Sequence, residues 1–313
     1  METSAREEPA TPEVSTVPET HEHGVGDAGE QLRRSGTARL FLDAAMRLHA
    51  VDGTTYARAL AHSSITTLIP ALIAVIGFVT TFGLHDLRTL LEDAATSFAP
   101  GPAGGILTDA ITKAEPSSAT FALVAGLAGM LFSGTIGMMH LERAANRIYG
   151  VAERRGVVRR WAIALALAAT VEVMLIAALA MIVAGGSVGE GSNGARPESG
   201  IWPFLRWPIG VGLVAVAMTV IFRVVPNRRQ PGFSWLLSGT TVSVVAWVLA
   251  TMVLGLVYER VSSLGGSYGS LLGVLALLVW AFGTGLAVLF GLAFAAQLEA
   301  ERADRGIGSA AGR

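Results

Sequence analysis

The chain has 313 residues, of which 52% are hydrophobic and 15% are charged, and it contains no cysteine. The charged fraction lies well below the roughly 25% of an average globular domain, and the lack of cysteine excludes disulfides, thiolate metal sites and cysteine nucleophiles. The formal net charge of -1 argues against a general nucleic-acid-binding protein.

Residues 1–36 are predicted to form a disordered acidic tail. The segment is rich in Pro, Glu, Thr, Ser and Gly and has hardly any aliphatic cluster. It therefore cannot bury enough apolar surface to offset the entropy that ordering would remove. It also lacks the basic start and apolar core of a cleavable signal peptide.

Residues 37–58 are predicted to contain an amphipathic helix. Between Thr37 and Val51, apolar side chains share one helical face and charged side chains lie opposite. The apolar set is Leu40, Phe41, Ala44, Leu48 and Val51, and the charged set is Arg39, Asp43 and Arg47. An interfacial helix on the cytoplasmic leaflet and a helix packed beneath a bundle both fit this pattern.

Residues 59–300 carry six long apolar runs, which predict an all-α, polytopic membrane bundle of six transmembrane helices. The runs are Ser63 to Leu84, Thr120 to Leu141, Trp161 to Gly185, Pro208 to Val225, Phe233 to Tyr258 and Ser270 to Leu298. Each reaches the roughly 17 to 25 residues that cross about 30 Å of hydrocarbon. None alternates with a period of two, which excludes a membrane barrel. Residues 301–313 are predicted to be a cytoplasmic C-terminal tail.

The distribution of basic residues predicts the orientation of the bundle. Of the 23 Lys and Arg residues, 18 fall in alternate segments that include both termini. Because positive charge is retained in the cytoplasm during insertion, both termini are expected on the cytoplasmic side of the inner membrane. The densest group, Arg143 to Arg160, is interpreted as a topology anchor that contacts anionic lipid headgroups.

Small residues recur every four positions in the second and sixth runs. They are Ala125, Gly129, Ser133 and Gly137, and Gly283, Ala287, Gly291 and Ala295. Lipid offers no hydrophobic drive for helix association, so stripes of small residues allow close backbone packing instead. Both stripes are therefore predicted to be helix contacts.

A polar face on the first run and one carboxylate in the third form the candidate transport site. The polar face consists of His62, Ser63, Thr66, Thr67 and Pro70. It fits either the lining of a cavity or a packed, hydrogen-bonded helix contact. Glu172 lies near the midpoint of the third run, where a carboxylate is costly and therefore a functional candidate. The alternative is a protonated acid hydrogen-bonded to another helix, and His62 is a conceivable partner.

Four short motifs stand out between about Arg39 and Glu301. They are Ala59-Leu60-Ala61 with Thr67 and Pro70, Asn146 and Arg147 within Ala145 to Gly150, Arg223 with Pro226 and Asn227, and Tyr268 and Gly269 leading to Gly291. In this order they resemble the motifs of the YihY/BrkB family of bacterial inner-membrane proteins. The resemblance implies a membrane protein for which transport has been proposed without an agreed substrate. Where the family's last span usually has Gly-Ala-Glu, this chain has Gly291-Leu292-Ala293, so that carboxylate is missing.

Members of this family are often catalogued as ribonuclease BN. Metal-assisted hydrolysis of RNA needs clustered His and Asp ligands, whereas the six histidines here are scattered along the chain. We therefore expect no ribonuclease activity, no enzyme, no bound metal or cofactor, and no nucleic-acid partner.

Two functional classes remain open. A transporter, exporter or lipid translocator is indicated by the polar first run and by Glu172, and no P-loop supports ATP-driven transport. A structural or scaffolding membrane protein without transport activity is the alternative. A homo-oligomer is compatible with either class.

Overall fold

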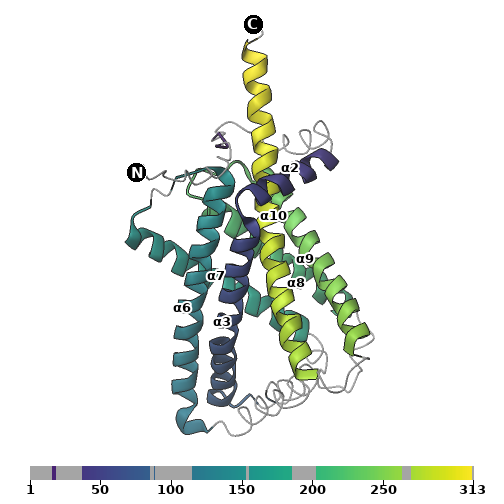
Figure 1. The fold of residues 1–313 in the computed structure, drawn as a ribbon. Coiled ribbons are helices and arrows are strands. Elements are labelled where there is room, and N and C mark those ends of the chain that lie inside the picture. Colours follow the sequence, from purple (N-terminus) through teal and green to yellow (C-terminus); the bar gives the residue numbers. More distant parts are fainter. Residues whose placement is uncertain are drawn as a thin grey trace, which may run out of the picture.

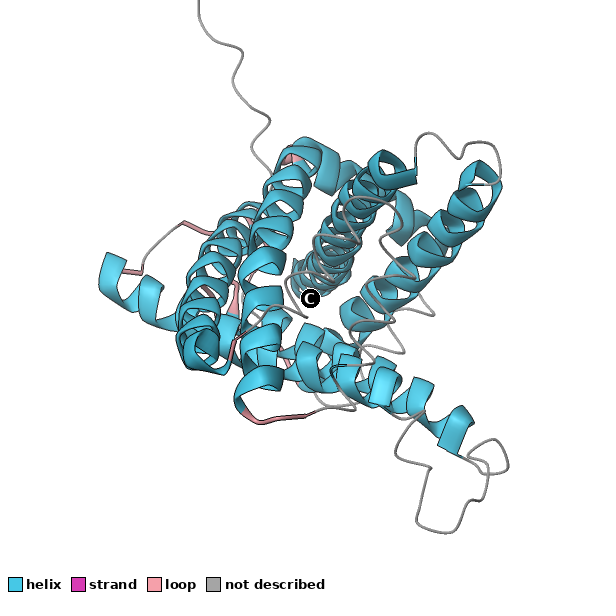
Figure 2. Cartoon of the chain, turned by 90° about the horizontal axis from the view of Figure 1, so that it is seen from below, coloured by secondary structure: helices cyan, strands magenta, loops and turns pink. Residues whose placement is uncertain are grey.

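The computed structural model of the chain describes residues 16–18, 37–84, 88, 115–152, 155–184, 202–262 and 269–311. The regular structure in these residues is entirely helical (Figure 2). The helices are α2 (Thr37–Ala50), α3 (Gly53–Thr81), α6 (Pro116–Tyr149), α7 (Val157–Ala184), α8 (Trp202–Val224), α9 (Phe233–Ser262) and α10 (Gly269–Ala311). The predicted all-α bundle is therefore confirmed (Figure 1).

Within the described residues, six helices are long and apolar enough to cross a membrane: α3, α6, α7, α8, α9 and α10. Each contains most of one predicted apolar run, which confirms the six predicted spans. α10 has 43 residues, which corresponds to about 65 Å at 1.5 Å per residue. That length is roughly twice the hydrocarbon thickness of a bilayer, and its C-terminal part extends beyond the other helices (Figure 1).

The six spanning helices pack as a closed ring. Each helix contacts the next in the order α3, α6, α7, α8, α9 and α10, and α10 returns to contact α3. α10 also contacts α6. Neighbours in the sequence are thus neighbours in space, and the first and last spans close the ring.

α2 lies across one end of the bundle and packs against α10 (Figure 1). Its predicted apolar face is the packed face, since Leu40 and Ala44 are fully buried and Phe41 lies 5.0 Å from the Phe294 ring of α10. Leu42 and Met46 are exposed on the other side. The helix is therefore packed beneath the bundle and still presents apolar residues outward.

The boundary between the amphipathic helix and the first span differs from the prediction. Residues 53–58 were expected with the amphipathic helix but belong to α3. Asp52 adopts a left-handed conformation with φ 56, which breaks the helix between Ala50 and Gly53. Periodicity cannot reveal such a turn, because both helices continue with similar residues.

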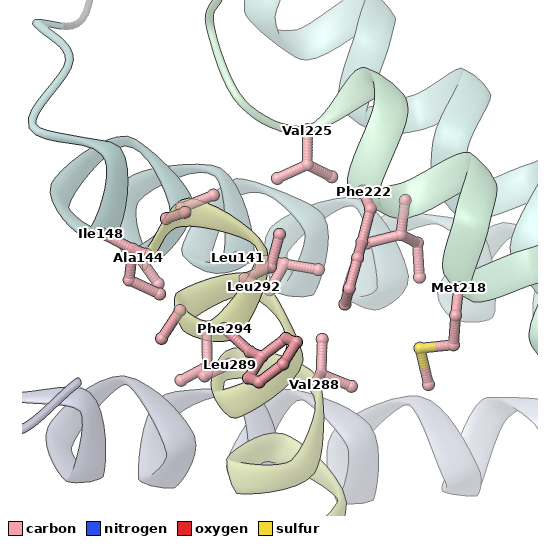
Figure 3. Packing of buried hydrophobic residues seen from close by; sticks show 14 of the residues in the cluster. Leu141, Ala144, Ile148, Met218, Phe222, Val225, Val288, Leu289, Leu292 and Phe294 are labelled. Carbon is pink, nitrogen blue, oxygen red and sulfur yellow. The ribbon is translucent and has the colours of Figure 1, made fainter. Parts of the chain in front are cut away.

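The buried core lies where α6 and α8 end and where α7 and α9 begin. Figure 3 shows Leu289 and Leu292 of α10 packed among Leu141 of α6 and Phe222 of α8. We call this half of the bundle, formed by residues 137–152, 155–160, 219–243 and 287–302, the basic end. The opposite end includes the C-terminal part of α9 and the N-terminal part of α10.

Glycines allow close contact at two helix crossings. A Cβ added to Gly126 of α6 would lie 2.8 Å from the Pro70 carbonyl of α3, and one on Gly291 of α10 would lie 2.6 Å from the Gly239 carbonyl of α9. Within the predicted α6 stripe, Cβ atoms at Gly129 and Gly137 would lie 2.9 and 3.3 Å from Pro70 and Ser63 of α3. Both predicted stripes are therefore packing faces, with one exception. Ala125 is exposed, because Gly126 takes the contact with α3.

Three residues of the predicted tail lie against the basic end. Val17 is 2% exposed, and its N–H donates to the Tyr149 carbonyl at 3.1 Å. Thr16–Pro18 therefore make contacts that the prediction for the tail did not include, because composition cannot reveal a surface that distant helices build. The other residues of the predicted tail lie outside the described residues.

Candidate functional site

Glu172 of α7 lies against α6, about halfway along the helix. One of its carboxylate oxygens occupies the space that a side chain at Gly134 would fill. Both oxygens are buried and have no hydrogen-bond partner among the described residues. Ala164 and Ala168, which lie eight and four residues before Glu172 and therefore on the same helical face, are buried, so this face of α7 packs against other helices.

The hydroxyls on the polar face of α3 are hydrogen-bonded, and part of this face packs against α6, whereas Thr66 is exposed. The Ser63 hydroxyl donates to the Ala59 carbonyl at 3.0 Å, and those of Thr66 and Thr67 donate to the His62 and Ser63 carbonyls, each at 2.8 Å. These bonds satisfy the hydroxyls within their own helix.

The contacts between α3 and α6 favour the packed interpretation of this polar face. Ser63 Oγ lies 3.2 Å from His140 Nδ1, and a Cβ on Gly129 would lie 2.9 Å from Pro70 Cβ. His62 is exposed. Since the Glu172 oxygens have no partner among the described residues, His62 is not bonded to Glu172.

A buried ion pair at the basic end joins segments far apart in the sequence. Arg228, between α8 and α9, donates from Nη2 to Glu299 Oε2 of α10 at 2.6 Å, with the two side chains 0% and 1% exposed. The Arg228 guanidinium also lies 4.7 Å from the Tyr149 ring centroid of α6. Because both charges are removed from water, loss of either would leave the other uncompensated.

Arg47 fixes α2 to the same cluster. Its Nη1 donates to the Ile148 carbonyl of α6 at 2.7 Å, and its Nε donates to Gln297 Oε1 of α10 at 3.1 Å. Burial lowers the pKa of the Arg47 guanidinium from its ordinary value, although arginine remains protonated in proteins. α2 is thus held by charge-assisted hydrogen bonds as well as by its apolar face.

A second buried carboxylate positions the start of α7. Glu142 of α6 accepts hydrogen bonds from Arg155 Nη1 and Arg160 Nε, both at 3.1 Å. Arg155 Nη2 also donates to the Val224 carbonyl at the end of α8 at 3.0 Å, where helical carbonyls lack partners. Arg155 and Arg160, expected among the headgroup contacts, therefore make internal contacts.

Three of the residues that resemble family motifs meet at the basic end. Asn146 of α6 is buried, and its Oδ1 accepts the Asn227 backbone N–H at 2.8 Å. Asn227 Nδ2 donates to the Ala152 carbonyl at 3.4 Å, and Pro226 is buried beside it. Together they fix the turn after α8 to the end of α6.

The other family-motif residues are dispersed. Arg147 lies 5.9 Å from the Tyr56 ring centroid, Arg223 is exposed, and Gly291 packs against Gly239. Gly269 is the first residue of α10, and Tyr268 lies outside the described residues. These positions do not form one site.

Glu299 was not predicted as a functional residue, although its helical spacing from apolar residues indicated a buried position. Glu299 lies seven residues after Leu292 and three after Ala296, both fully buried, so the helical period places it on the buried face of α10. The expected family position at Ala293 carries no carboxylate, but Glu299 supplies one further along the helix. Nothing in the loop sequence indicated that Arg228 would be its partner.

No group of three or more His, Asp or Glu side chains in the described parts of the chain is arranged to hold a metal ion. The described parts of the chain contain two kinds of buried carboxylate, one without a hydrogen-bond partner and one in an ion pair. Near the middle of α7, Glu172 has no hydrogen-bond partner among the described residues, whereas Arg228 and Glu299 are paired at the basic end. The two carboxylates therefore differ in what each can do.

Comparison with known proteins gives a consistent family assignment. The family described as Virulence factor BrkB matches residues 44–312. The chain is 21% identical over 248 residues to YfkH of Bacillus subtilis, whose name describes it as ribonuclease-like, covering 77% of this chain and 88% of YfkH. No solved structure is significantly similar.

Two further relatives are named only as UPF0761 membrane proteins. The one from Rhodospirillum rubrum is 25% identical over 279 residues, covering 85% of this chain and 60% of the relative. The one from Ralstonia nicotianae is 26% identical over 250 residues, covering 77% of this chain and 54% of the relative. The chain thus spans little more than half the length of these relatives. From the match of almost all of its membrane domain, the chain belongs to the BrkB family of multi-pass membrane proteins.

Proposed function

We propose that this protein is a transporter, exporter or lipid translocator that does not hydrolyse ATP, and that Glu172 carries the proton or cation on which its cycle depends. The observation that carries the proposal is the position of Glu172, near the middle of α7, with both carboxylate oxygens buried and neither hydrogen-bonded among the described residues. Ionisable groups at this depth mark ion pathways and proton relays in membrane proteins.

The environment of Glu172 supports a group that changes its charge or its partner. An ionised carboxylate without a partner costs on the order of 2.5–3.5 kcal/mol or more in a membrane. Gly134 leaves the carboxylate room on the facing helix. A protonated acid that releases its proton when the bundle rearranges would satisfy both observations.

We further propose that the basic end faces the cytoplasm from the inner membrane and contacts anionic headgroups. Arg143, Arg159 and Arg223 are exposed there, in contrast to the buried Arg228. Exposed arginines at a span end favour both cytoplasmic placement and anionic lipid. A reporter fused to the C-terminus should be inaccessible from outside intact cells, and extracellular labelling would contradict this orientation.

Flux in proteoliposomes tests the proposal directly. The full chain would be reconstituted, with proton movement followed by an internal pH-sensitive dye and lipid movement by a fluorescent phospholipid. We expect the wild-type protein to raise at least one flux above protein-free vesicles. Glu172→Gln, which cannot ionise, should return that flux to the protein-free level because the carrier group is lost.

Glu115→Gln is the matched control, because Glu115 is an exposed carboxylate at the start of α6. It should retain wild-type flux. Equal flux from Glu172→Gln and the wild type would remove Glu172 from the mechanism. Both variants must elute as the same monodisperse species, so that loss of flux is not loss of fold.

A structural or scaffolding protein is the second candidate, and the α3 contacts favour it. The α3 hydroxyls are satisfied within the helix, and Pro70 packs against glycines of α6. A wild-type protein without proton or lipid flux would support this candidate. Neither candidate assigns a catalytic step, and the ribonuclease-like name of YfkH is not carried over.

A further inference from the structure

The tail residues Thr16–Pro18 make directed contacts with two segments of the basic end. The Val17 N–H donates to the Tyr149 carbonyl at 3.1 Å, and the Thr16 hydroxyl donates to the Gly150 carbonyl at 3.2 Å. These acceptors lie at the C-terminal end of α6, where helical carbonyls need partners from outside the helix. The tail therefore completes the end of α6.

The same residues cover Arg228. Its Nη1 donates to the Val17 carbonyl at 3.3 Å, and its Nη2 donates to the Pro18 carbonyl at 3.4 Å as well as to Glu299. The Val17 side chain is 2% exposed and belongs to the main apolar core. Two donor groups of a buried guanidinium are thus satisfied by a segment that enters from the tail.

We propose that residues 16–18 form a latch that binds reversibly at the basic end and controls access to the buried Arg228–Glu299 pair. Within residues 16–18, the one apolar anchor is Val17, and the remaining contacts are hydrogen bonds of 3.1 to 3.4 Å. Three residues held in this way bury far less surface than a helix interface, so their release does not require the bundle to unfold.

Opening the latch changes the chemistry of the basic end. Arg228 loses the Val17 and Pro18 carbonyls, so two of its donor directions face the position that the tail has left. Buried donors without acceptors are costly, and water or another acceptor must replace the tail. The latch thus couples the N-terminal tail to the ion pair that joins the α8–α9 loop to α10, independently of any role of Glu172.

Cysteine labelling tests whether residues 16–18 are bound at the basic end. The chain has no native cysteine, so a single introduced cysteine is the only thiol. Val17→Cys and Thr16→Cys would be made in the full chain and reacted with a maleimide. Thr16 is exposed and Val17 is buried, so Val17→Cys should react at least about tenfold more slowly, limited by opening of the latch. Equal rates would overturn the proposal, and denaturation should abolish the difference.

Chemical modification of arginine side chains tests whether the latch controls access to Arg228. Phenylglyoxal would be applied to the full-length wild type and to Val17→Asp, and modified residues would be located by peptide mass spectrometry. We expect modification of Arg228 to rise severalfold in Val17→Asp, because a carboxylate in the apolar anchor site releases the latch. Exposed Arg223 should react equally in both proteins.

Unchanged modification of Arg228 in Val17→Asp would show that the tail does not cover it, and would overturn the proposal. Val17→Ala retains an apolar residue and should give an intermediate increase, which keeps the test decisive if Val17→Asp folds poorly. Proton and lipid flux are not part of either measurement. Failure of the latch and failure of the transport proposal are therefore distinguishable.

Discussion

The two ends of the bundle are built differently. At the basic end, side chains such as Leu289 and Leu292 are fully buried, and Arg228 and Glu299 form an ion pair out of contact with solvent. At the opposite end, the last turns of α9 are exposed on most sides, with Met252 and Leu256 each 60% exposed. The same apolar composition thus gives a packed core in one half and open helix faces in the other.

Exposed apolar helix faces are compatible with lipid as the surrounding solvent. An apolar side chain gains little by leaving lipid for a helix contact, so exposed Leu and Met are stable against acyl chains. A water-facing end offers no such surroundings, and helix ends there carry carbonyls that need partners. Among the described residues, the ion pairs between largely buried side chains and the arginine contacts to helix-end carbonyls lie at this end.

The largest expected effect comes from breaking the buried pair. Arg228→Met leaves Glu299 buried without its partner and should lower the free energy of unfolding by about 3–5 kcal/mol. Arg228→Met combined with Glu299→Leu should recover much of this loss, because no buried charge remains. Denaturant unfolding in detergent, followed by tryptophan fluorescence, measures both.

Arg39→Met is the control for the ion-pair series. Its contact with Asp43 is 3.7 Å long, and 82% of the Arg39 side chain is exposed, so the change should stay below about 1 kcal/mol. An equal effect of Arg228→Met and Arg39→Met would mean that the buried pair does not hold the basic end together.

A smaller effect is expected from two glycines on the same helix. Gly291→Ala places a Cβ 2.6 Å from the Gly239 carbonyl and should destabilise the protein by about 1–3 kcal/mol through overpacking. A Cβ on Gly273, near the opposite end, meets nothing within 4 Å, so Gly273→Ala should be neutral or slightly stabilising. If the two variants had equal melting temperatures, the difference in packing between the ends would be disproved.

The smallest effect is expected from the exposed arginines. Replacing both Arg143 and Arg159 with Gln should change the free energy of unfolding in neutral detergent by less than about 0.5 kcal/mol. Stabilisation by added phosphatidylglycerol, relative to phosphatidylcholine, should fall by about 1 kcal/mol per arginine. The reference is Arg260→Gln, at the far end of α9. If Arg260→Gln lost as much lipid stabilisation as the double variant, a specific role for the basic end would be contradicted.

The helices could be predicted from the sequence because the hydrophobicity of each residue is a local property, so a long apolar run predicts a membrane span by itself. The runs that contain α6 and α9 were visible as long apolar segments, and the stripe ending at Gly291 was visible from spacing alone. The candidate site was only partly predictable. Glu172 stood out as a charge in an apolar run, but the polar face around Ser63 could not be assigned to a cavity or a contact until its bonds to Ala59 and His140 were seen.

By itself, the sequence determined the membrane as solvent, the six spans and the amphipathic face of α2, since these depend on local composition and period. Only the tertiary structure decided that Arg228 meets Glu299 and that Val17 docks beside Tyr149. Both contacts join positions far apart in the chain. The ring of helices brings them together, and no local pattern specifies which distant group will satisfy a buried charge or a helix end.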